Sequence, residues 1–284
     1  MQIAISGSSG FLGSTLKKCF EDKGWKVVDI PRFMVTDDQY LDSLTRLIEG
    51  SQVVINLRGA SIVGRWTKKY MQEIYDSRMV TTKMLVNSVL TLNQKDLLFI
   101  SASATGIYQE GSTHSETSKK FNTQFLGKIC TDWENAALRA SENGIRTVIF
   151  RSGIIIGHKG GVVKKLKPIF KIGMGAVILP SKGSFPWVHI QDWCNACLHV
   201  INNKSSEGIY NLSASHTTTQ KEFAKALAKS VKRPLLFVLP GFILRIFLGK
   251  GASVLNRNPA VISERLESEG FCFKFENILD AFGR

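Results

Sequence analysis

Short apolar runs alternate with amphipathic stretches through the first half of the 284-residue chain. The apolar runs predict strands over residues 3–6, 26–30, 53–57, 97–100 and 147–151. Between them, apolar residues recur at helical spacing over residues 11–23, 40–48, 68–92 and 122–143. Strands that are apolar throughout are covered by helices on both faces. The pattern therefore predicts an α/β fold with a Rossmann-type, doubly wound parallel sheet.

The pattern loosens after Arg151, where residues 157–184 are rich in Gly and Lys. The later elements are expected as strands over residues 187–190 and 209–212 and as helices over residues 162–171, 192–202 and 219–229. Thr219 and Glu222 have the spacing of a capping box at the start of the last of these helices.

Composition adds a strong positive charge to this picture. The formal net charge is +14, in a chain that is otherwise ordinary for a globular protein, with 44% hydrophobic residues. The basic residues are spread along the chain in short groups such as Lys164-Lys165, whereas nucleic-acid-binding proteins usually cluster them on one element. We therefore expect scattered, solvated surface charge, with attraction of an anionic cofactor or substrate as the alternative, and no nucleic-acid partner.

The cysteines and the apolar segments point to a cytoplasmic protein without membrane association. Five irregularly spaced cysteines argue against a disulfide framework and for a reducing compartment. Cys194 and Cys197 form a C-x-x-C pattern on an expected buried helix face, and since no second pair completes a zinc site, no metal is expected. Strand-like residues begin at Gln2, so no signal peptide is expected. The longest apolar stretch, residues 234–248, contains Pro240 and is too short to span a bilayer.

A glycine triad follows the first expected strand and opens the first expected helix. Gly7 allows a tight turn, Gly10 lets the backbone approach a pyrophosphate, and Gly13 allows close packing of helix on strand. The helix N-terminus beside it offers unpaired N–H groups with positive dipole character. The strand–turn–helix context predicts a dinucleotide-binding loop over residues 7–13.

The end of the second expected strand indicates which dinucleotide binds. An acidic residue there would bind the ribose 2′-hydroxyl of NAD, whereas an arginine accommodates the 2′-phosphate of NADP. Arg32 is the first residue after this strand that is free to swing over the adenosine ribose, which favours NADP. Asp29 keeps NAD open as the alternative.

Several motifs together resemble an extended short-chain dehydrogenase/reductase, and more narrowly its atypical branch of NAD-dependent epimerase/dehydratase-like proteins, also called nucleoside-diphosphate-sugar epimerase-like. The motifs are the glycine triad, Asn56-Leu-Arg-Gly59, Gly64-Arg65-Trp66, Ser77-Arg78, Ser101-Ala-Ser-Ala-Thr-Gly-Ile-Tyr108, Trp133-Glu134, Arg151-Ser-Gly153, Gly160-Gly161, Trp187-Val-His-Ile-Gln-Asp192 and Gly270-Phe-x-Phe273. The resemblance covers nearly the whole chain and is specific for the family, but it indicates no particular reaction.

The resemblance implies a Rossmann domain, residues 1–156 plus about 187–212, and a smaller C-terminal α/β substrate-binding domain, about 157–186 plus 213–284. It implies cofactor contacts at Gly7, Ser9, Gly10, Phe11, Leu12, Gly13, Arg32, Leu57, Arg58, Gly59, Ser101, Ala102, Gly153, Ile154 and Ile155. Arg58 departs from the family, whose strands usually end Asn-Leu-Ala-Gly, so its side chain must find room or point outward. Gly249-Lys250 departs from a usual Gly-Glu.

The pair of residues that carries proton transfer in typical extended members is missing. Those members use Tyr-x-x-x-Lys, in which the Tyr exchanges the proton and the Lys lowers its pKa. Here Phe125 and Ile129 stand at these positions, and Lys128 lies one residue, about 100°, away from the lysine's face of the helix. The atypical branch lacks the pair as well.

Other residues are candidates to replace the pair, each with an ordinary structural alternative. The catalytic candidates are Ser103, Tyr108 and Lys128, which could instead serve in a turn, in the core and on a solvated helix face. The substrate-binding candidates are Arg65, Trp66, Ser103 and Trp187; Arg65 and Trp66 could equally anchor their loop. Asp192 is expected as the N-cap of its helix, ahead of a role in chemistry.

Two functions from different classes follow. The first is an NADP-dependent oxidoreductase or epimerase-like enzyme acting on a small-molecule substrate, such as a sugar nucleotide or a small carbonyl compound. The alternative is a regulatory protein that senses NADPH without turnover. Analogy with extended relatives suggests a homodimer.

Overall fold

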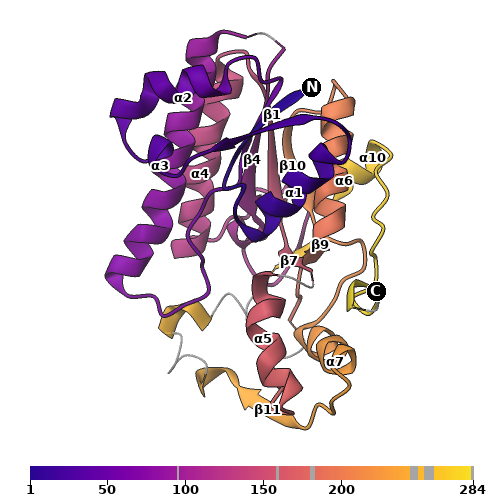
Figure 1. Cartoon of the computed structure of the whole chain (residues 1–284). Coiled ribbons are helices and arrows are strands. Elements are labelled where there is room, and N and C mark those ends of the chain that lie inside the picture. The colour runs from indigo at the N-terminus through magenta and orange to yellow at the C-terminus, as the bar shows by residue number, and fades with distance from the viewer. Residues whose placement is uncertain (95, 158–159, 180–182, 244–248, 253–258, 283–284) are drawn as a thin grey trace.

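Six parallel strands form the central sheet of the computed structural model, which describes residues 1–94, 96–157, 160–179, 183–243, 249–252 and 259–282 (Figure 1). The strands are β1 (Gln2–Ser6), β2 (Lys26–Ile30), β3 (Val53–Asn56), β4 (Leu98–Ala104), β6 (Arg146–Ser152) and β10 (Gly208–Leu212). Their order in the sheet is β10-β6-β4-β3-β1-β2. The chain leaves β1 toward β2 and then returns to β3 on the other side of β1. Such a reversal of strand order opens a crevice beyond the carboxyl ends of the strands, where ligands bind.

Helices cover both faces of this sheet, as the apolar pattern predicts. One face packs against α1 (Phe11–Glu21) and α6 (Ile190–Asn202), and the other against α2 (Leu41–Ile48), α3 (Lys68–Leu92) and α4 (Phe125–Glu142). The alternation along β1 makes this possible, since Ile3 and Ile5 enter the core under α1 and α6 while Ala4 enters the opposite core. The doubly wound Rossmann-type fold is confirmed.

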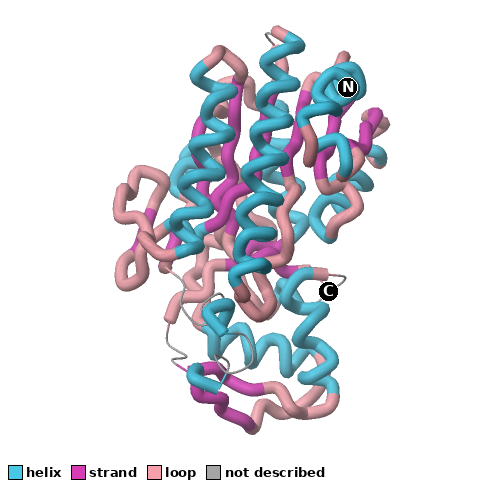
Figure 2. The backbone as a smooth tube through the Cα atoms, turned by 90° about the vertical axis from the view of Figure 1, so that its left-hand side faces the viewer, coloured by secondary structure: helices cyan, strands magenta, loops and turns pink. Residues whose placement is uncertain are grey.

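A second apolar core lies beyond the carboxyl edge of the sheet, in a smaller lobe (Figure 2). It is built around the aromatic residues Phe170, Phe185, Trp187, Phe223, Phe275 and Phe282. The helices around it are α5 (Gly161–Lys171) and α7 (Gln220–Ser230). Short strand pairs complete the fold: β7 (Ile154–Ile156) with β9 (Trp187–His189), β8 (Ala176–Leu179) with β11 (Phe237–Pro240), and β5 (Thr113–His114) with β12 (Ala260–Val261). The exact domain boundaries stay a prediction.

The remaining described elements are single turns. They are the 3-10 helices η1 (Phe33–Val35), η2 (Asp38–Tyr40), η3 (Thr105–Ile107), η4 (Gly249–Ala252) and η5 (Asp280–Phe282), together with the short helix α10 (Glu264–Ser268). No described helix has the length and apolarity needed to cross a membrane. The described residues also contain no group of three or more His, Cys, Asp or Glu side chains placed to hold a metal ion.

Two sequence expectations about local structure are corrected and one is confirmed. Asp192 is not an N-cap, because α6 begins at Ile190 and His189 caps it by accepting from the Gln191 N–H at 3.2 Å. The buried Asp192 carboxylate instead accepts the backbone N–H groups of Lys274 and Phe275, at 2.9 and 3.0 Å, which fixes the C-terminal segment to α6. Strand β4 runs four residues further than expected, to Ala104. The capping box at the start of α7 is present.

Candidate functional site

The glycine loop between β1 and α1 leaves backbone amides open at the helix N-terminus. Gly7 has φ +85°, a conformation that side chains disfavour, and its carbonyl accepts the Gly10 N–H at 3.0 Å. A Cβ on Gly13 would lie 2.2 Å from the Gly7 carbonyl oxygen, so only glycine allows α1 to approach the turn this closely. Gly10 is the N-cap and supplies no side-chain acceptor, and the first turn of α1 contains no acidic residue. An anion can therefore take the place of a cap.

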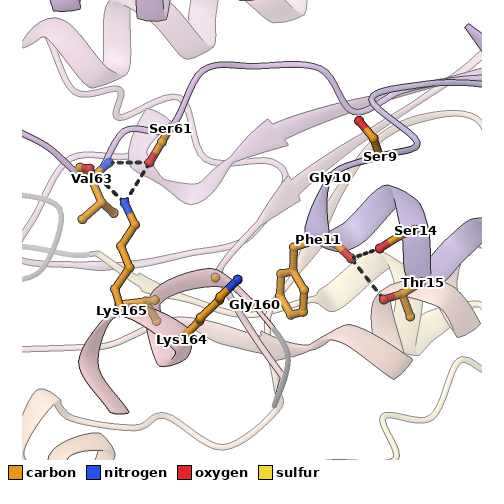
Figure 3. A pocket seen from close by; sticks show the side chains of 12 residues that line it. Ser9, Gly10, Phe11, Ser14, Thr15, Ser61, Val63, Gly160, Lys164 and Lys165 are labelled. Carbon is orange, nitrogen blue, oxygen red and sulfur yellow. Dashed lines mark hydrogen bonds between the residues drawn. The ribbon is translucent and has the colours of Figure 1, made fainter. Parts of the chain in front are cut away.

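A cleft of about 560 Å³ opens beside this loop (Figure 3). Three segments wall it: the glycine loop with the start of α1, the loop that follows β3, and the start of α5. The lining residues are Ser9, Gly10, Phe11, Ser14, Thr15, Ser61, Val63, Gly160, Gly161, Val162, Lys164 and Lys165. Of these, Ser9, Gly10 and Phe11 were predicted to contact the cofactor.

The α5 wall of the cleft was missed by sequence reasoning. Lys165 reaches across the cleft and donates to the Ser61 hydroxyl at 3.3 Å and to the Val63 carbonyl at 3.1 Å (Figure 3). Lys164 lines the same cleft. The signal available in the sequence was the Lys164-Lys165 pair, but these lysines lie about 150 positions from the glycine loop, and no local spacing connects the two.

The Gly160-Gly161 pair lets the start of α5 lie against the glycine loop. A Cβ on Gly160 would lie 2.1 Å from Cδ2 of Phe11, and Gly161 has φ +63°. Residues 143–191, which include all of α5, contain no Asp or Glu. Positive charge is therefore concentrated on this side of the cleft, which differs from the expected even scatter over the surface. Such a wall attracts an anionic ligand.

Two arginines follow the strands on either side of β1. Ser6, the last residue of β1, is paired with Ile30 of β2 and with Asn56 of β3. Arg32 and Arg58 each lie two residues beyond these partners, so both flank the glycine turn at the same sheet edge. Arg32 is exposed and Arg58 is half-buried.

Asp29, the residue that kept NAD open, already has cationic and hydroxyl partners. The Lys17 ammonium donates a hydrogen bond to the Asp29 carboxylate. Burial raises the pKa of Asp29, but the hydrogen bonds from Lys17 and Ser8 outweigh it and hold that pKa below its usual value. This carboxylate therefore stays ionised and is paired within the protein.

The other predicted cofactor residues lie along the same edge, with different exposure. The Leu57 N–H donates to the Ser6 carbonyl at 3.0 Å, which holds the start of the loop after β3 against β1. A Cβ on Gly59 would lie 2.8 Å from the Arg78 guanidinium carbon, so this glycine makes room for Arg78 under the loop. Ser101 and Gly153 are buried, while Ala102, Ile154 and Ile155 are half-buried, and Leu12 is half-buried on α1.

Two of the three catalytic candidates belong to a buried hydrogen-bond network. The Ser103 hydroxyl donates to Glu134 at 2.6 Å, and the Arg151 guanidinium donates to both oxygens of Glu134 at 2.9 and 2.7 Å. Arg151 also donates to the Tyr108 hydroxyl at 2.8 Å, and that hydroxyl donates to the Asn211 side-chain oxygen at 2.7 Å. All five side chains are 5% exposed or less.

The network accounts for the direction of two pKa shifts. Burial alone would lower the pKa of Arg151, but the hydrogen bonds and charge of Glu134 outweigh it and raise that pKa. Burial raises the pKa of Tyr108 despite the nearby guanidinium. Ser103 and Tyr108 thus serve the core of the fold in this structure, and we do not retain Tyr108 as a proton carrier.

The segment in place of the Tyr/Lys pair is apolar. Phe125, the first residue of α4, packs edge-on against Trp66 with 5.2 Å between ring centroids. Ile129 is buried, and Lys128 is exposed on another face of the helix, so it is the solvated lysine of the structural alternative. We do not retain Lys128 as a catalytic candidate.

The substrate-binding candidates divide into two kinds. Trp66 is half-buried, donates its indole N–H to the Ile62 carbonyl at 2.9 Å and so anchors its own loop. Arg65 beside it is exposed. Trp187 is 1% exposed and donates to the Thr218 hydroxyl at 2.9 Å, within the second apolar core. Trp187 therefore packs within this core in the structure, and its contact with a substrate stays a prediction.

The comparisons with known proteins agree with this geometry. The model of the NAD dependent epimerase/dehydratase family matches residues 3–213, and that of a domain of unknown function, DUF1731, matches residues 239–284. An epimerase family protein of Mycobacterium leprae is 31% identical over 291 residues, covering 98% of this chain and 94% of its own. One from Staphylococcus aureus is 28% identical over 288 residues, covering 98% and 96%. The crystal structure of the human epimerase family protein SDR39U1 with NADPH has a TM-score of 0.90 at 25% identity and covers 99% of this chain and 98% of its own.

Proposed function

Because the chain belongs to the NAD dependent epimerase/dehydratase family, we propose that it binds NADP(H) in the cleft beside its glycine loop and acts as an oxidoreductase or epimerase-like enzyme. The proposed substrate is a small molecule, such as a sugar nucleotide or a small carbonyl compound. The observation that carries the proposal is the uncapped N-terminus of α1, which opens into a cleft whose charged lining residues, Lys164 and Lys165, are both cations.

The residues of the cleft fit a pyrophosphate. Its oxygens would accept the free N–H groups in the first turn of α1, which follow Gly10, and the helix dipole also favours negative charge there. Lys164 and Lys165 would supply compensating charge from the opposite wall. Phe11 packs between the glycine loop and the start of α5, because its ring fills the space that the Gly160-Gly161 pair leaves open.

The adenosine end favours NADP over NAD. Asp29 is the residue that would accept a ribose 2′-hydroxyl, but it is already paired with Lys17. Arg32 is exposed at the adjoining strand end and is free to contact a 2′-phosphate. The solved human relative, which is similar over the full length, has NADPH in its crystal structure.

When bound, the nicotinamide would supply hydride-transfer chemistry. We propose that Phe125 and Trp66, whose rings are in contact, form an apolar wall at that end, where the usual Tyr/Lys pair is missing. Such a wall orients a substrate but cannot donate a proton. We therefore propose that any proton needed comes from solvent or from the substrate itself.

Transfer of deuterium tests the enzymatic part of this proposal. Purified protein is incubated with NADPH deuterated at the nicotinamide C4 position and a broad panel of carbonyl compounds and sugar nucleotides, and products are examined by mass spectrometry. We expect one class of substrate to gain deuterium, with no transfer when protein is omitted. Tight NADPH binding without transfer to any compound, and without epimerisation of any sugar nucleotide when NADP+ is supplied, would favour the alternative.

That alternative is a regulatory protein that senses NADPH. The observation that favours it is the engagement of Ser103 and Tyr108 in a buried network, together with apolar residues in place of the usual pair. It requires a partner whose binding depends on NADPH, which pull-down experiments with and without the nucleotide would reveal.

Replacing Arg32 by alanine tests the choice of cofactor. A charge-assisted hydrogen bond to phosphate contributes about 1.5–3 kcal/mol, so Arg32→Ala should weaken NADPH about tenfold to hundredfold. NADH lacks the 2′-phosphate and should bind within about twofold of wild type, since no such bond is lost. Calorimetric titration with each nucleotide measures both affinities. Equal losses for the two nucleotides would show that Arg32 does not contact the 2′-phosphate.

We further propose that the protein is a cytoplasmic homodimer without a nucleic-acid partner. Its five cysteines are free, as a reducing compartment would keep them. By analogy with extended relatives, the dimer contact would use the two helices that flank the missing Tyr/Lys segment. Sedimentation velocity would decide the oligomeric state.

A further inference from the structure

The half-buried Arg58 has a buried polar atom that no other group satisfies. Its backbone leaves β3 directly beside the glycine turn, because a Cβ on Gly7 would lie 3.3 Å from the Arg58 backbone nitrogen. Its side-chain Nε is buried and has no hydrogen-bond partner. No described carboxylate forms an ion pair with it. A buried donor atom without a partner is costly unless a ligand supplies the acceptor.

Arg58 lies within electrostatic reach of a second arginine. Burial lowers the pKa of Arg58 first, and the positive charge of Arg32 lowers it further. Two guanidinium groups that repel each other in the free protein gain the most from an anion placed between them. The carboxylate of Asp29, on the same sheet edge, is held by Lys17 and Ser8 and does not fill this role.

The strand register explains why the two arginines lie at the same edge of the sheet. β1 lies between β2 and β3, and the strand ends are aligned through Ser6, Ile30 and Asn56. Arg32 and Arg58 thus flank the glycine turn from its two sides at one point of the sheet edge, close enough for the charge of Arg32 to lower the pKa of Arg58. This point is where the ribose of a dinucleotide lies when its pyrophosphate occupies the start of the helix.

We infer that Arg58 is a second specificity residue, which together with Arg32 grips the phosphomonoester at the ribose 2′ position of NADP(H). The inference rests on the proposed function and deepens it. Arg58 would donate Nε and one terminal nitrogen to the phosphate, the geometry in which guanidinium binds phosphate with two parallel hydrogen bonds. The unsatisfied Nε of the free protein is then satisfied by the ligand.

The experiment compares two nucleotides that lack nicotinamide, adenosine 2′,5′-bisphosphate and adenosine 5′-monophosphate, on the full chain. Arg58→Ala should weaken the bisphosphate about tenfold to hundredfold and leave the monophosphate within about twofold. Arg58→Lys keeps the charge and loses the planar guanidinium. Its affinity for the bisphosphate should lie between those of wild type and Arg58→Ala. Arg46→Ala, which removes the same charge from an exposed position on α2, should change neither affinity.

The outcomes separate this inference from the proposed function. If wild type binds NADPH but Arg58→Ala weakens the bisphosphate and the monophosphate equally, Arg58 contacts the adenine or a shared phosphate, and the inference is overturned. An Arg58→Ala variant that binds both nucleotides as wild type does would overturn it as well. If wild type binds neither NADPH nor NADH, the proposed function itself fails. Thermal unfolding of each variant without nucleotide shows whether the fold is intact.

Discussion

Replacing Gly10 by aspartate should abolish NADP(H) binding and leave the stability of the free protein nearly unchanged. Gly10 is the N-cap of α1 and lines the cleft, and the N–H groups of the first turn that follow it have no side-chain cap. A carboxylate there would satisfy those groups from within the chain and would repel the pyrophosphate. At about 4 Å and an effective dielectric of 20, two like charges repel by about 4 kcal/mol, which corresponds to a loss of affinity of about a thousandfold.

Aspartate at position 10 is compatible with the structure of α1 in the absence of nucleotide. Gly10 has φ −74° and ψ 173°, an extended conformation that an N-cap aspartate adopts readily. A Cβ would lie 3.2 Å from the Gly7 carbonyl oxygen, which requires a small adjustment. Aspartate is a better N-cap than glycine by a few tenths of a kcal/mol, so we expect unfolding free energy within about 1 kcal/mol of wild type.

Gly10→Asn is the matched control, since asparagine has the size and capping ability of aspartate without the charge. Its affinity should lie between those of wild type and Gly10→Asp. Fluorescence titration with NADPH measures affinity, and urea denaturation measures stability. A Gly10→Asp protein that binds NADPH as wild type does would mean that the pyrophosphate does not lie at this helix end.

Replacing Glu134 by alanine should destabilise the protein by about 3–5 kcal/mol, the usual cost of leaving a buried charge without its partner. Glu134 accepts both hydrogen bonds from Arg151, at 2.9 and 2.7 Å, and a third from Ser103. Alanine removes all three hydrogen bonds and, among the described residues, leaves the guanidinium with the Tyr108 hydroxyl, at 2.8 Å, as its one acceptor. Urea denaturation followed by circular dichroism measures the loss.

Two further variants make this result specific. Glu134→Gln keeps one acceptor and the packing, so it should cost less than alanine. Glu142→Ala, at an exposed position near the end of the same helix, should stay within about 0.5 kcal/mol of wild type. If Glu134→Ala were no more destabilising than Glu142→Ala, the network would not contribute to the fold, and Ser103 would again be free to serve as a catalytic group.

The features that depend on a few consecutive residues could be predicted from the amino-acid sequence. Apolar runs and helical spacing gave the strands and helices of the doubly wound sheet, because each pattern is a property of a few consecutive residues. The glycine triad was predictable for the same reason, since Gly7, Gly10 and Gly13 act within one turn of backbone. The loss of the Tyr/Lys pair was also evident, because Phe125 and Ile129 stand at a fixed spacing on one helix.

Contacts between residues far apart in the sequence became evident from the three-dimensional structure. Lys165 reaches Ser61 from 104 positions away, and Asp192 binds the backbone at Lys274 and not the start of its own helix. Ser103 was expected just past the end of its strand, but β4 continues beyond it. The strand therefore holds the Ser103 hydroxyl beside the Glu134 carboxylate. Such contacts follow from strand order and helix packing, and a side chain's chemistry is set by the partners that those bring to it. Residue type and local spacing do not predict which side chains those partners are.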